Sequence, residues 1–591
     1  MFLPTTPEEV KELGWKSLDI ILVTGDTYID SPYSGVAIIG KTLLKAGYHV
    51  GVIAQPNVND NADISRLGEP ILLWGVTGGT VDSMVANYTA TLRKRRSDDF
   101  TPGGLNNRRP DRAVIVYANL IRRAFKGTVP IVIGGIEASL RRITHYDYWT
   151  DKLRAPILFD AKADYLLYGM AESSVVELAN SLRVKRSPHG IRGLAYLAKE
   201  APKDYLVLPS FEEAVANTDE FTRMFEMFYQ NNDPLTARGI VQKKVDRYYV
   251  QNPPALTLAE STLDEVYAID WERAQHPYYA QQGDVKALET IQFSIPTHRG
   301  CYGECNFCAI AVHEGRTVSS RSEASILAEA EKMTHHPAFK GIIRDIGGPT
   351  ANMYQIECVK KMHSGACADK RCIFPEICPV LKINHTPQVT LLQKVRSIPG
   401  VRKVFVGSGI RYDMVMADQA CGLTYMKELV NHHVSGQLKV APEHTDPYVL
   451  QMMGKPSPGS LNKFKGKFEE YSKEAGKDQF LTYYLIAAYP GCSDREMKKL
   501  KEYATNQLHV SPEQVQVFTP TPSTYASVMY YTEKDPFTGK PIFVEKDLKR
   551  KSIQKEIITP SDRSRIGSSE NPLVKRNNGY AKIKKNPRKR T

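Results

Sequence analysis

Three cysteines occupy eight residues in the stretch RGCYGECNFCAI. Cys301, Cys305 and Cys308 are separated by three and then by two residues. In a chain without a secretory signal, such clustering indicates metal ligation rather than disulfides. A short glycine-containing loop can turn all three sulfurs toward one iron–sulfur cube, and three ligands leave one of its irons open for chemistry. The alternatives are a zinc knuckle that lacks a nearby fourth ligand and a set of buried free thiols.

A second group of cysteines follows within twenty-one residues, and it consists of Cys358, Cys367, Cys372 and Cys378. Four thiolates suffice for a tetrahedral zinc or for a second, fully ligated cluster, and the sequence leaves that choice open. The segment is polar and rich in turn formers, so we expect a metal-pinned flap beside the mouth of the site. His363 and His385 are reserve ligands. The alternative is a loop of reduced, unligated thiols.

The first cysteine group, with Phe307 before its last cysteine, resembles the cluster loop of the radical S-adenosylmethionine superfamily. The resemblance implies that S-adenosylmethionine chelates the open iron through its amino and carboxylate groups. It also implies that the reduced [4Fe-4S] cluster cleaves the sulfonium and releases a 5′-deoxyadenosyl radical. A reductant of the flavodoxin or ferredoxin type is the partner that this chemistry needs.

Three longer motifs resemble a narrower group, the YgiQ family of radical S-adenosylmethionine proteins. They are Gly134–Trp149, Asp345–Tyr354 and Val515–Tyr531. The likeness runs from about Leu18 to about Lys555. It implies the fold and the cofactor chemistry but no substrate, and no catalytic side chain is assigned.

Such a site requires a barrel strand before the cysteine loop and further βα units after it. Six stretches read as strands: Glu289–Pro296, Gly341–Ile346, Val401–Val406, Gln437–Val440, Phe480–Ala488 and Val515–Phe518. Stretches of helical composition lie between them, such as Ser320–Thr334, Gly422–His433 and Ser493–Gln507. This alternation indicates parallel βα units, and the resemblance implies a partial (βα)6 barrel.

Two glycines end the second expected strand. Gly347 and Gly348 resemble the superfamily's glycine-rich turn, which implies that their backbone meets the amino group of S-adenosylmethionine. A glycine suits that contact because the missing Cβ lets the main chain approach a ligand closely. Pro349 stands where an acidic residue usually follows.

Polar residues follow the next two expected strands. Ser408 and Arg411 end the third strand, and Glu443 lies just beyond the fourth. Active residues in such barrels lie at the carboxyl ends of strands, so we expect these three to meet the ribose and carboxylate of the cofactor. For Arg411 and Glu443 the alternative is a surface ion pair. Tyr489–Gly491 ends the fifth strand with an aromatic-Pro-Gly turn like that of many superfamily members.

The N-terminal part, residues 1–200, reads as a doubly wound α/β domain of the Rossmann type. Strands are expected at Leu18–Thr24, Tyr48–Ile53, Ile71–Trp74, Ala113–Tyr117, Pro130–Ile133 and Tyr165–Leu167. Similar domains precede the barrel in cobalamin-dependent members of the superfamily, whose D-x-H-x-x-G signature supplies a histidine to the cobalt. Asp30–Gly35 has this frame with Pro32 in the histidine's place, so cobalamin is disfavoured as a cofactor. The alternative interpretation is that this is a degenerate α/β domain that shapes the substrate cleft.

Two glycines and a run of aromatics are candidates for lining that cleft. They are Gly134, Gly135 and His145–Trp149, and the aromatics could equally belong to the core. Residues 201–286 are expected to form a helical connector with an amphipathic helix near Phe211–Tyr229. Residues 287–559 then form the radical S-adenosylmethionine core with a C-terminal extension.

The chain has 591 residues, of which 42% are hydrophobic and 24% charged, which excludes a mostly disordered protein. No apolar run reaches the roughly 20 residues that span a bilayer. The first residues also lack the basic region and apolar stretch of a secretory signal. We therefore expect a cytoplasmic protein without membrane contact.

Most of the net charge lies at the C-terminus. Residues 560–591 hold ten Lys or Arg against two Asp or Glu, which is +8 of the formal net charge of +13. This composition is typical of a disordered tail that solubilises the protein, and it could also bind RNA by counterion release. The sequence thus favours a radical enzyme of unknown substrate. The alternative function is a non-catalytic iron–sulfur or zinc protein with an RNA-binding tail.

Overall fold

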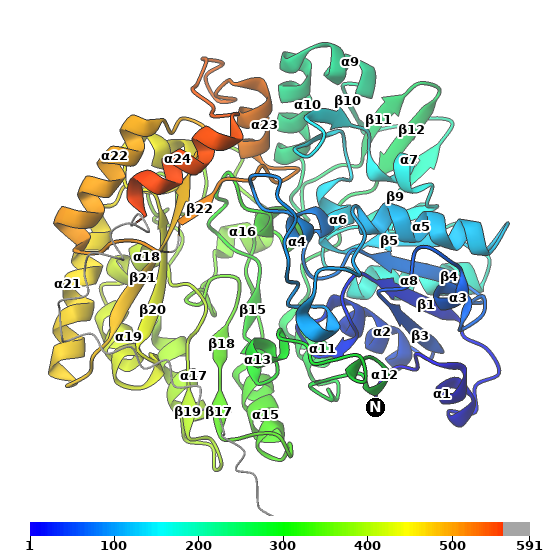
Figure 1. The fold of residues 1–591 in the computed structure, drawn as a ribbon, viewed down its shortest axis with the longest axis horizontal. Helices are drawn as coiled ribbons and strands as arrows, with labels where there is room; N and C mark the ends of the chain where they lie inside the picture. The colour runs from blue at the N-terminus through cyan, green and yellow to red at the C-terminus, as the bar shows by residue number, and fades with distance from the viewer. Residues whose placement is uncertain (514, 560–591) are drawn as a thin grey trace, which may run out of the picture.

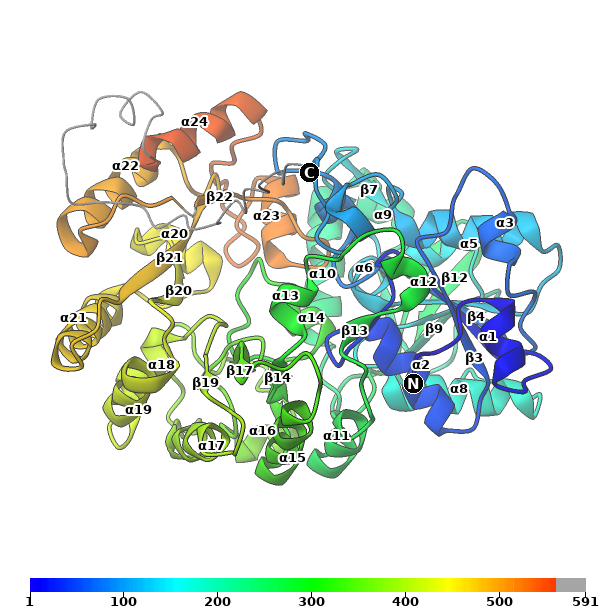
Figure 2. The ribbon, with the colours of Figure 1, turned by 60° about the horizontal axis from the view of Figure 1, so that its bottom comes forward.

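Two α/β bodies lie side by side in the chain (Figures 1 and 2). The computed structural model describes residues 1–513 and 515–559. A nine-stranded sheet forms the N-terminal body, and an arc of mostly short parallel strands forms the second body. The predicted fold class, a doubly wound α/β domain followed by a partial barrel, is confirmed. The basic residues 560–591 lie outside the described residues.

Five parallel strands form the centre of the large sheet. In spatial order they are β3 (Val50–Ala54), β1 (Ile20–Thr24), β4 (Leu73–Thr77), β5 (Ile131–Gly134) and β8 (Tyr165–Leu167). Numbered along the chain, this is the 2-1-3-4-5 order of one doubly wound class. The order reverses between β1 and β4, so the carboxyl ends of these two strands flank a crevice that commonly binds ligands.

Helices cover both faces of this sheet, which explains why every residue of β1 is buried. Ile20 and Leu22 pack in one apolar cluster with α2 (Gly35–Lys45) and α8 (Glu172–Arg183). Ile21 and Val23 pack in another with α5 (Ala113–Ala124).

The expected strand at Ala113–Tyr117 is wrong, because these residues open helix α5. The β-branched run AVIVY suggested a strand. The buried residues of the whole segment are Ala113, Val114, Tyr117, Ala118, Leu120 and Ile121. That spacing of three and four places them on one face of a helix, and tertiary burial outweighs the local preference for a strand.

The segment 201–286 does more than connect the two bodies. It holds α9 (Phe211–Ala216), α10 (Thr218–Gln230) and α11 (Glu260–Tyr267), as expected for a helical stretch. It also adds three strands to the large sheet, which the expectation of a helical connector did not include. These are β10 (Leu206–Leu208), β11 (Ile240–Lys244) and β12 (Arg247–Gln251), and β12 pairs with β9 (Leu194–Ala198).

The second body is an open arc of parallel pairs. β14 (Ser294–Pro296) pairs with β18 (Asp345–Gly347), and β17 (Ile342–Ile343) pairs with β19 (Lys403–Val404). A parallel bridge from Ile410 to Val440 leads to the next three strands. These are β20 (Gln437–Glu443), β21 (Phe480–Ala487) and β22 (Val515–Val517). Their carboxyl ends therefore share one rim.

Helices alternate with these strands, as the sequence predicts. They include α15 (Glu323–Thr334), α17 (Thr386–Arg396), α19 (Gly422–Glu428), α21 (Gly459–Glu474) and α22 (Asp494–Tyr503). Ser493 begins α22 with a capping box to Glu496, which satisfies backbone donors of the first turn.

The first barrel strand is shorter than expected. Of Glu289–Pro296, only the last three residues form β14, while helix α13 (Leu288–Ile291) occupies the start. Residues 294–296 have a partner in β18. The residues before them close local bonds instead, such as Ile291 N–H to the Ala287 carbonyl.

The C-terminal extension packs back onto the N-terminal body. It comprises α23 (Tyr525–Thr532) and α24 (Leu548–Ile558). Tyr146 of β6 (His145–Asp147) lies against two tyrosines of α23, with ring centroids 5.8 and 5.1 Å apart. The buried ammonium of Lys551 donates to the hydroxyls of Tyr148 and Tyr530, at 3.0 and 2.8 Å. The aromatic run at 145–149 therefore belongs mainly to the core. No helix among the described residues is long and apolar enough to cross a membrane.

Candidate functional site

The cysteine loop leaves the first barrel strand and is closed at its base by a small hairpin. β15 (His298–Arg299) pairs antiparallel with β16 (Ser319–Ser320), which brings the two ends of the loop together. Gly300 follows with φ +79, and a Cβ there would lie 2.1 Å from the Thr317 carbonyl oxygen. Only glycine fits this turn, so the base of the loop has a fixed path.

Two sulfurs of this loop, those of Cys301 and Cys305, lie close to Gly303. A Cβ on Gly303 would lie 3.2 Å from Cys301 Sγ and 3.6 Å from Cys305 Sγ, and the Gly303 N–H points to Cys301 Sγ at 3.3 Å. Burial raises the pKa of the Cys301 and Cys308 thiols, and the neighbouring cysteines add to the rise because thiolates repel one another. Such a group of thiols suits a bound cation that compensates their charge.

Three cysteine sulfurs on one loop are a donor set that a [4Fe-4S] cube can take from a protein. Within residues 1–513 and 515–559, no three Cys, His, Asp or Glu side chains lie close enough to hold a single metal ion. In a cube each thiolate binds a different iron, so three cysteines would leave one iron without a protein ligand.

The rest of the loop is anchored to the far side of the barrel. The Asn306 N–H and side-chain amide donate to the carbonyls of Met453 and Met452, at 2.9 and 2.8 Å. The ring of Phe307 lies edge-on to Tyr489, with centroids 6.1 Å apart. The expected aromatic-Pro-Gly turn thus supports the cluster loop through Tyr489.

The glycine turn lies directly beside the cysteine loop. Pro296 of β14 is in register with Gly347 of β18, so the two strands deliver both loops to the same rim. A Cβ on Gly348 would lie 2.6 Å from the ring of His298. The hydroxyl of Thr350 is 3.5 Å from Cys301 Sγ. The structure thus brings the two loops together, as a shared cofactor requires.

Arg411 is not part of a surface ion pair. Its guanidinium pairs with Asp413 at 2.5 Å and points a second nitrogen at Cys305 Sγ, 3.9 Å away. Burial lowers the pKa of this guanidinium, but the charge of Asp413 more than offsets that effect and the pKa is raised. A fixed positive charge therefore stands beside the cysteine sulfurs.

A chain of side chains positions Arg411, and the sequence analysis missed it. Asn352 accepts from the Arg411 N–H at 2.8 Å and donates to its carbonyl at 3.0 Å. His385 lies between Asn352, at 3.2 Å, and Asp418, at 2.8 Å. Both ring nitrogens of His385 are therefore engaged here. The only sequence signal was its place at the start of α17.

Glu443 also reaches the cysteine site. It lies at a β-bulge with φ +66, and Lys455 Nζ is 3.7 Å from its carboxylate. Burial raises the pKa of this carboxyl group, while Lys455 and Arg411 lower it. Because this carboxylate acts on the pKa of Cys308, it belongs to the same buried charge group as Arg411 and the cysteines.

Ser408 is held by Asp345, a residue that the sequence analysis did not select. The Ser408 hydroxyl and N–H both donate to the Asp345 carboxylate, and the Gly407 N–H does so at 2.8 Å. The acidic residue before the glycines thus fixes the turn after the third strand. Ser408 lines the large cavity described next rather than the cysteine loop.

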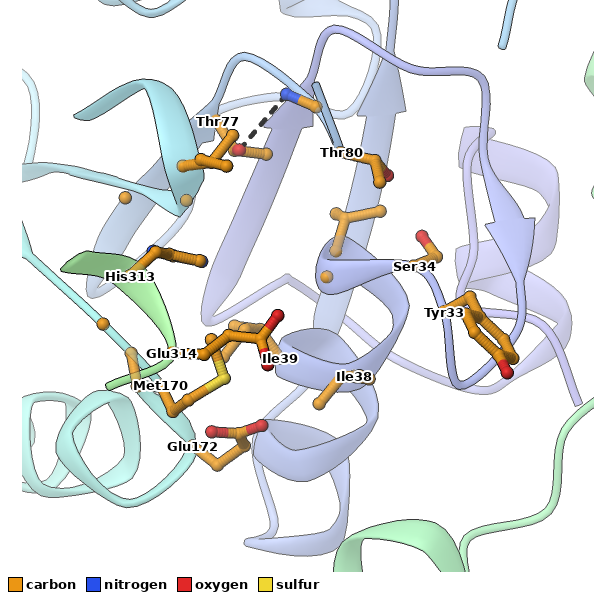
Figure 3. A pocket seen from close by; sticks show the side chains of 18 of the residues that line it. Tyr33, Ser34, Ile38, Ile39, Thr77, Thr80, Met170, Glu172, His313 and Glu314 are labelled. Carbon is orange, nitrogen blue, oxygen red and sulfur yellow. Dashed lines mark hydrogen bonds between the residues drawn. The ribbon is translucent and has the colours of Figure 1, made fainter. Parts of the chain in front are cut away.

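A cavity of about 510 Å³ lies between the two bodies. One wall comes from the carboxyl ends of β1, β4 and β5, including Thr24, Thr77 and Gly134. The facing wall comes from the barrel rim, including Gly348 and Ser408. Figure 3 shows Ser34 and Tyr33 on one side and His313 and Glu314 on the other. The cavity opens at the strand-order reversal of the large sheet and also reaches the glycine turn.

Two histidines, one buried and one partly buried, line this cavity with ring nitrogens that have no hydrogen-bond partner among the described residues. They are Nε2 of His298 and Nδ1 of His313. Burial lowers the pKa of each to about 4, so both rings are neutral at pH 7. A neutral imidazole can accept a proton or bind a metal.

Several N-terminal residues chosen from the sequence meet here. Pro32 and Gly35 of the D-x-P-x-x-G frame line the cavity, and so do Gly134 and Gly135. A Cβ on Gly135, which has φ +76, would lie 2.3 Å from the Thr77 hydroxyl. His145–Trp149 does not line this cavity.

The second cysteine group surrounds a much smaller cavity. Cys358, Cys367, Cys372 and Cys378 all line one space of about 20 Å³. Neither reserve ligand lines this space: His363 is exposed, and His385 belongs to the chain behind Arg411. The structure therefore brings the four cysteines together without the histidines.

Two solved structures are similar in fold at low identity. One is the radical S-adenosylmethionine methyltransferase TsrM from Kitasatospora setae, with cobalamin and a [4Fe-4S] cluster bound. It has a TM-score of 0.49 and 15% identity, and the match covers 87% of this chain and 74% of that one. The other is the cobalamin-dependent S-adenosylmethionine radical enzyme OxsB with aqua-cobalamin bound. It has a TM-score of 0.48 and 11% identity, over 90% and 58% of the chains.

These matches correct one prediction. Both enzymes are described with bound cobalamin, so the prediction that disfavoured cobalamin for this architecture is wrong. It rested on a single position. Pro32 has no side chain that can bind cobalt, but this removes one ligand and leaves the rest of a binding surface untouched.

Family comparisons cover nearly the whole chain. The Radical SAM N-terminal model matches residues 2–294, and a domain of unknown function, DUF3362, matches residues 513–567. A UPF0313 protein of Fusobacterium nucleatum is 57% identical over 565 residues, 95% of this chain and 100% of that protein. A UPF0313 protein of Thermotoga maritima is 47% identical over 559 residues, 94% and 98% of the two chains. The chain therefore belongs to the UPF0313 family, the YgiQ family of radical S-adenosylmethionine proteins that its motifs predicted.

Proposed function

We propose that this protein is an enzyme that binds one [4Fe-4S] cluster and cleaves S-adenosylmethionine reductively. The observation that carries the proposal is the meeting of the cysteine loop, the glycine turn and Arg411 at one rim of the barrel. Cys301, Cys305 and Cys308 would hold the cluster and leave one iron to the cofactor. A scaffold protein would need the cysteines but no such cradle around them.

The side chains around the loop have separable roles in this proposal. A reduced cluster bound there supplies the electron that cleaves the sulfonium of S-adenosylmethionine, and an external reductant of the flavodoxin or ferredoxin type reloads it. The backbone of Gly347 and Gly348, where the ring of His298 fills the space that a Cβ on Gly348 would need, is the proposed contact for the amino group of the cofactor. Arg411, held by Asp413 and Asn352, presents a positive charge that suits a carboxylate. Glu443 and Ser408 are candidates for the ribose hydroxyls.

The large cavity is the place we propose for the second reactant. It reaches the glycine turn on the barrel side and the strand-order reversal on the other, where α/β sheets bind ligands. About 510 Å³ is room for a ligand of drug-like size. Its chemical class is open. Cobalamin is the first compound to test, by absorbance of protein purified after incubation with hydroxocobalamin.

A filled cavity is the matched control for that test. Ser34 lines the cavity and makes no side-chain bond to the start of α2, so Ser34→Trp should block the space and leave the helix intact. Specific retention of cobalamin by the unmodified protein, lost in Ser34→Trp, would identify the ligand. Equal retention by both proteins would place any bound cobalamin elsewhere.

Product formation tests the proposed reaction. Anaerobically reconstituted protein with dithionite and S-adenosylmethionine should yield 5′-deoxyadenosine. Cys305→Ala should yield none, whereas Cys421→Ala, a buried cysteine outside both groups, should retain the activity. An intact cluster with no 5′-deoxyadenosine would refute the proposal and leave the non-catalytic iron–sulfur protein.

A further inference from the structure

The second cysteine group has the composition and the placement of a metal site of its own. We propose that Cys358, Cys367, Cys372 and Cys378 bind one zinc ion through four thiolates, separately from the cysteine loop. The four side chains come from a single segment and line one cavity of about 20 Å³. Four thiolates complete the coordination of one tetrahedral zinc ion and leave no open position, which is the arrangement of a structural site.

The segment can close around that ion. No three of these sulfurs lie within reach of one ion in the described chain, so the site tightens when the metal binds. Residues 365–385 form neither helix nor strand, and few backbone bonds therefore oppose a small shift. One bond sets the turn between two ligands: the Cys378 N–H donates to the Cys372 carbonyl at 2.8 Å.

The surroundings compensate the charge of such a site. Four thiolates on Zn²⁺ carry a net charge of about −2. The basic residues Lys360, Lys361, Lys370 and Arg371 line the same cavity. Lys361 is buried, and its Nζ lies 3.8 Å from Cys372 Sγ. This ammonium also donates to the Arg316 carbonyl at 2.5 Å, which holds it beside the sulfur, where it suits a metal-bound thiolate.

This site would also hold the neighbouring cysteine loop in place. Arg371 precedes Cys372 and donates to the Glu304 carbonyl at 2.9 Å and to the Asn306 side chain at 2.7 Å. Lys361 Nζ lies 3.6 Å from the Glu304 carboxylate. Tyr302, directly after Cys301, belongs to the same apolar cluster as Cys358. Zinc at the second site therefore fixes residues that contact the first.

Metal analysis of a variant without the first group tests the proposal independently of the enzymatic reaction. The background is Cys301→Ala, Cys305→Ala and Cys308→Ala, grown with zinc and iron. We expect about one zinc per chain and no iron. Adding Cys372→Ser and Cys378→Ser should remove the zinc, whereas adding Cys421→Ala should leave it. Cobalt in place of zinc should give the visible bands of a tetrahedral thiolate site.

Limited digestion supplies a second measurement that does not depend on the variants folding alike. Trypsin can cut after Lys370 or Arg371 within the segment. Chelation of zinc in the triple variant should speed that cut by about tenfold, because the segment then opens locally. Zinc near one equivalent together with this protection supports the proposal. A folded triple variant without metal refutes the site, and iron in place of zinc refutes the assignment of the ion.

Discussion

The two cysteine groups differ in the secondary structure and hydrogen bonds that fix their positions. The loop with Cys301, Cys305 and Cys308 starts at a strand, turns on a glycine that no other residue can replace, and is bonded to Met452 and Met453 across the barrel. Three cysteines of the second group lie in residues 365–385, which form neither helix nor strand, and Cys358 directly precedes the six-residue helix at 359–364. Contacts within the fold hold the first loop, whereas we propose that metal binding holds the second segment.

This difference gives each group its own response to metal loss. A site built by hydrogen bonds and packing keeps its shape when the metal is absent, so it can exchange a ligand during a reaction. A site built by its metal loses local order with the metal. The first arrangement suits cofactor chemistry and the second suits structural support.

The largest effect should follow removal of the first group. The triple alanine variant at positions 301, 305 and 308 should lose all iron of the cube, because no other described cysteine lies in that loop. The fold should survive, with a Tm lower by less than about 5 °C. Iron analysis and calorimetry measure both. Unfolding of the variant would mean that the metal also shapes the first site.

The next largest effect should follow acidification, which should destabilise the fold through four histidines. Burial lowers the pKa of His145, His298, His313 and His444 to about 4. Between pH 6.5 and 4 the unfolded chain therefore binds more protons than the folded one, so the free energy of unfolding falls as the pH falls. Each histidine contributes at most about 3 kcal/mol over this window.

Chemical denaturation from pH 7 to pH 4.5 measures this slope. His298→Asn should flatten it, whereas His363→Asn, on the exposed surface of α16 (Val359–Ser364), should leave it unchanged. Equal slopes for the protein and His298→Asn would show that the ring at 298 is not held neutral.

Loss of the guanidinium at 411 should weaken cofactor binding while the cluster remains. Arg411→Met removes a charge that lies 3.9 Å from Cys305 Sγ. We expect S-adenosylmethionine to bind about 10- to 100-fold more weakly, the range for a hydrogen bond to a charged group. Equilibrium binding with the reconstituted protein measures this. Arg396→Met, whose partner Glu428 lies away from the cysteines, is the control, and unchanged binding in Arg411→Met would contradict the assigned role.

The smallest effect concerns the link between the two groups. Arg371→Met removes both hydrogen bonds to the cysteine loop. We expect the cluster to be lost to a chelator about tenfold faster, as for one net hydrogen bond of about 1.4 kcal/mol. Lys370→Met, which changes the adjacent residue on the same cavity, should behave like the unchanged protein. Equal rates of cluster loss in Arg371→Met and Lys370→Met would show that the bonds from Arg371 do not stabilise the first cysteine group.

The sequence predicted those features that a local pattern encodes. The cysteine spacing, the Gly347–Gly348 turn and Arg411 all come together in the structure, since each follows a recognisable strand or a short motif. Alternation of apolar runs and helical stretches was enough for the fold class. The prediction of a strand at Ala113–Tyr117 was wrong because β-branched residues can also form the buried face of a helix.

Other features depend on contacts between distant segments, and no local pattern marks them. Asp345 fixes Ser408 from sixty-three residues away. The chain Asp418–His385–Asn352 positions Arg411, although His385 had seemed a reserve metal ligand. The strands added by residues 206–251 pair with a sheet that the preceding segment begins. The large cavity exists only once both bodies are placed.

The central claim is that S-adenosylmethionine binds the open iron of a cluster held by Cys301, Cys305 and Cys308. Electron paramagnetic resonance of the anaerobically reduced protein tests it most directly, with Cys372→Ser/Cys378→Ser present so that only the first group can respond. We predict a [4Fe-4S]⁺ signal whose shape changes when S-adenosylmethionine is added. A cluster signal that is the same with and without S-adenosylmethionine would contradict the account.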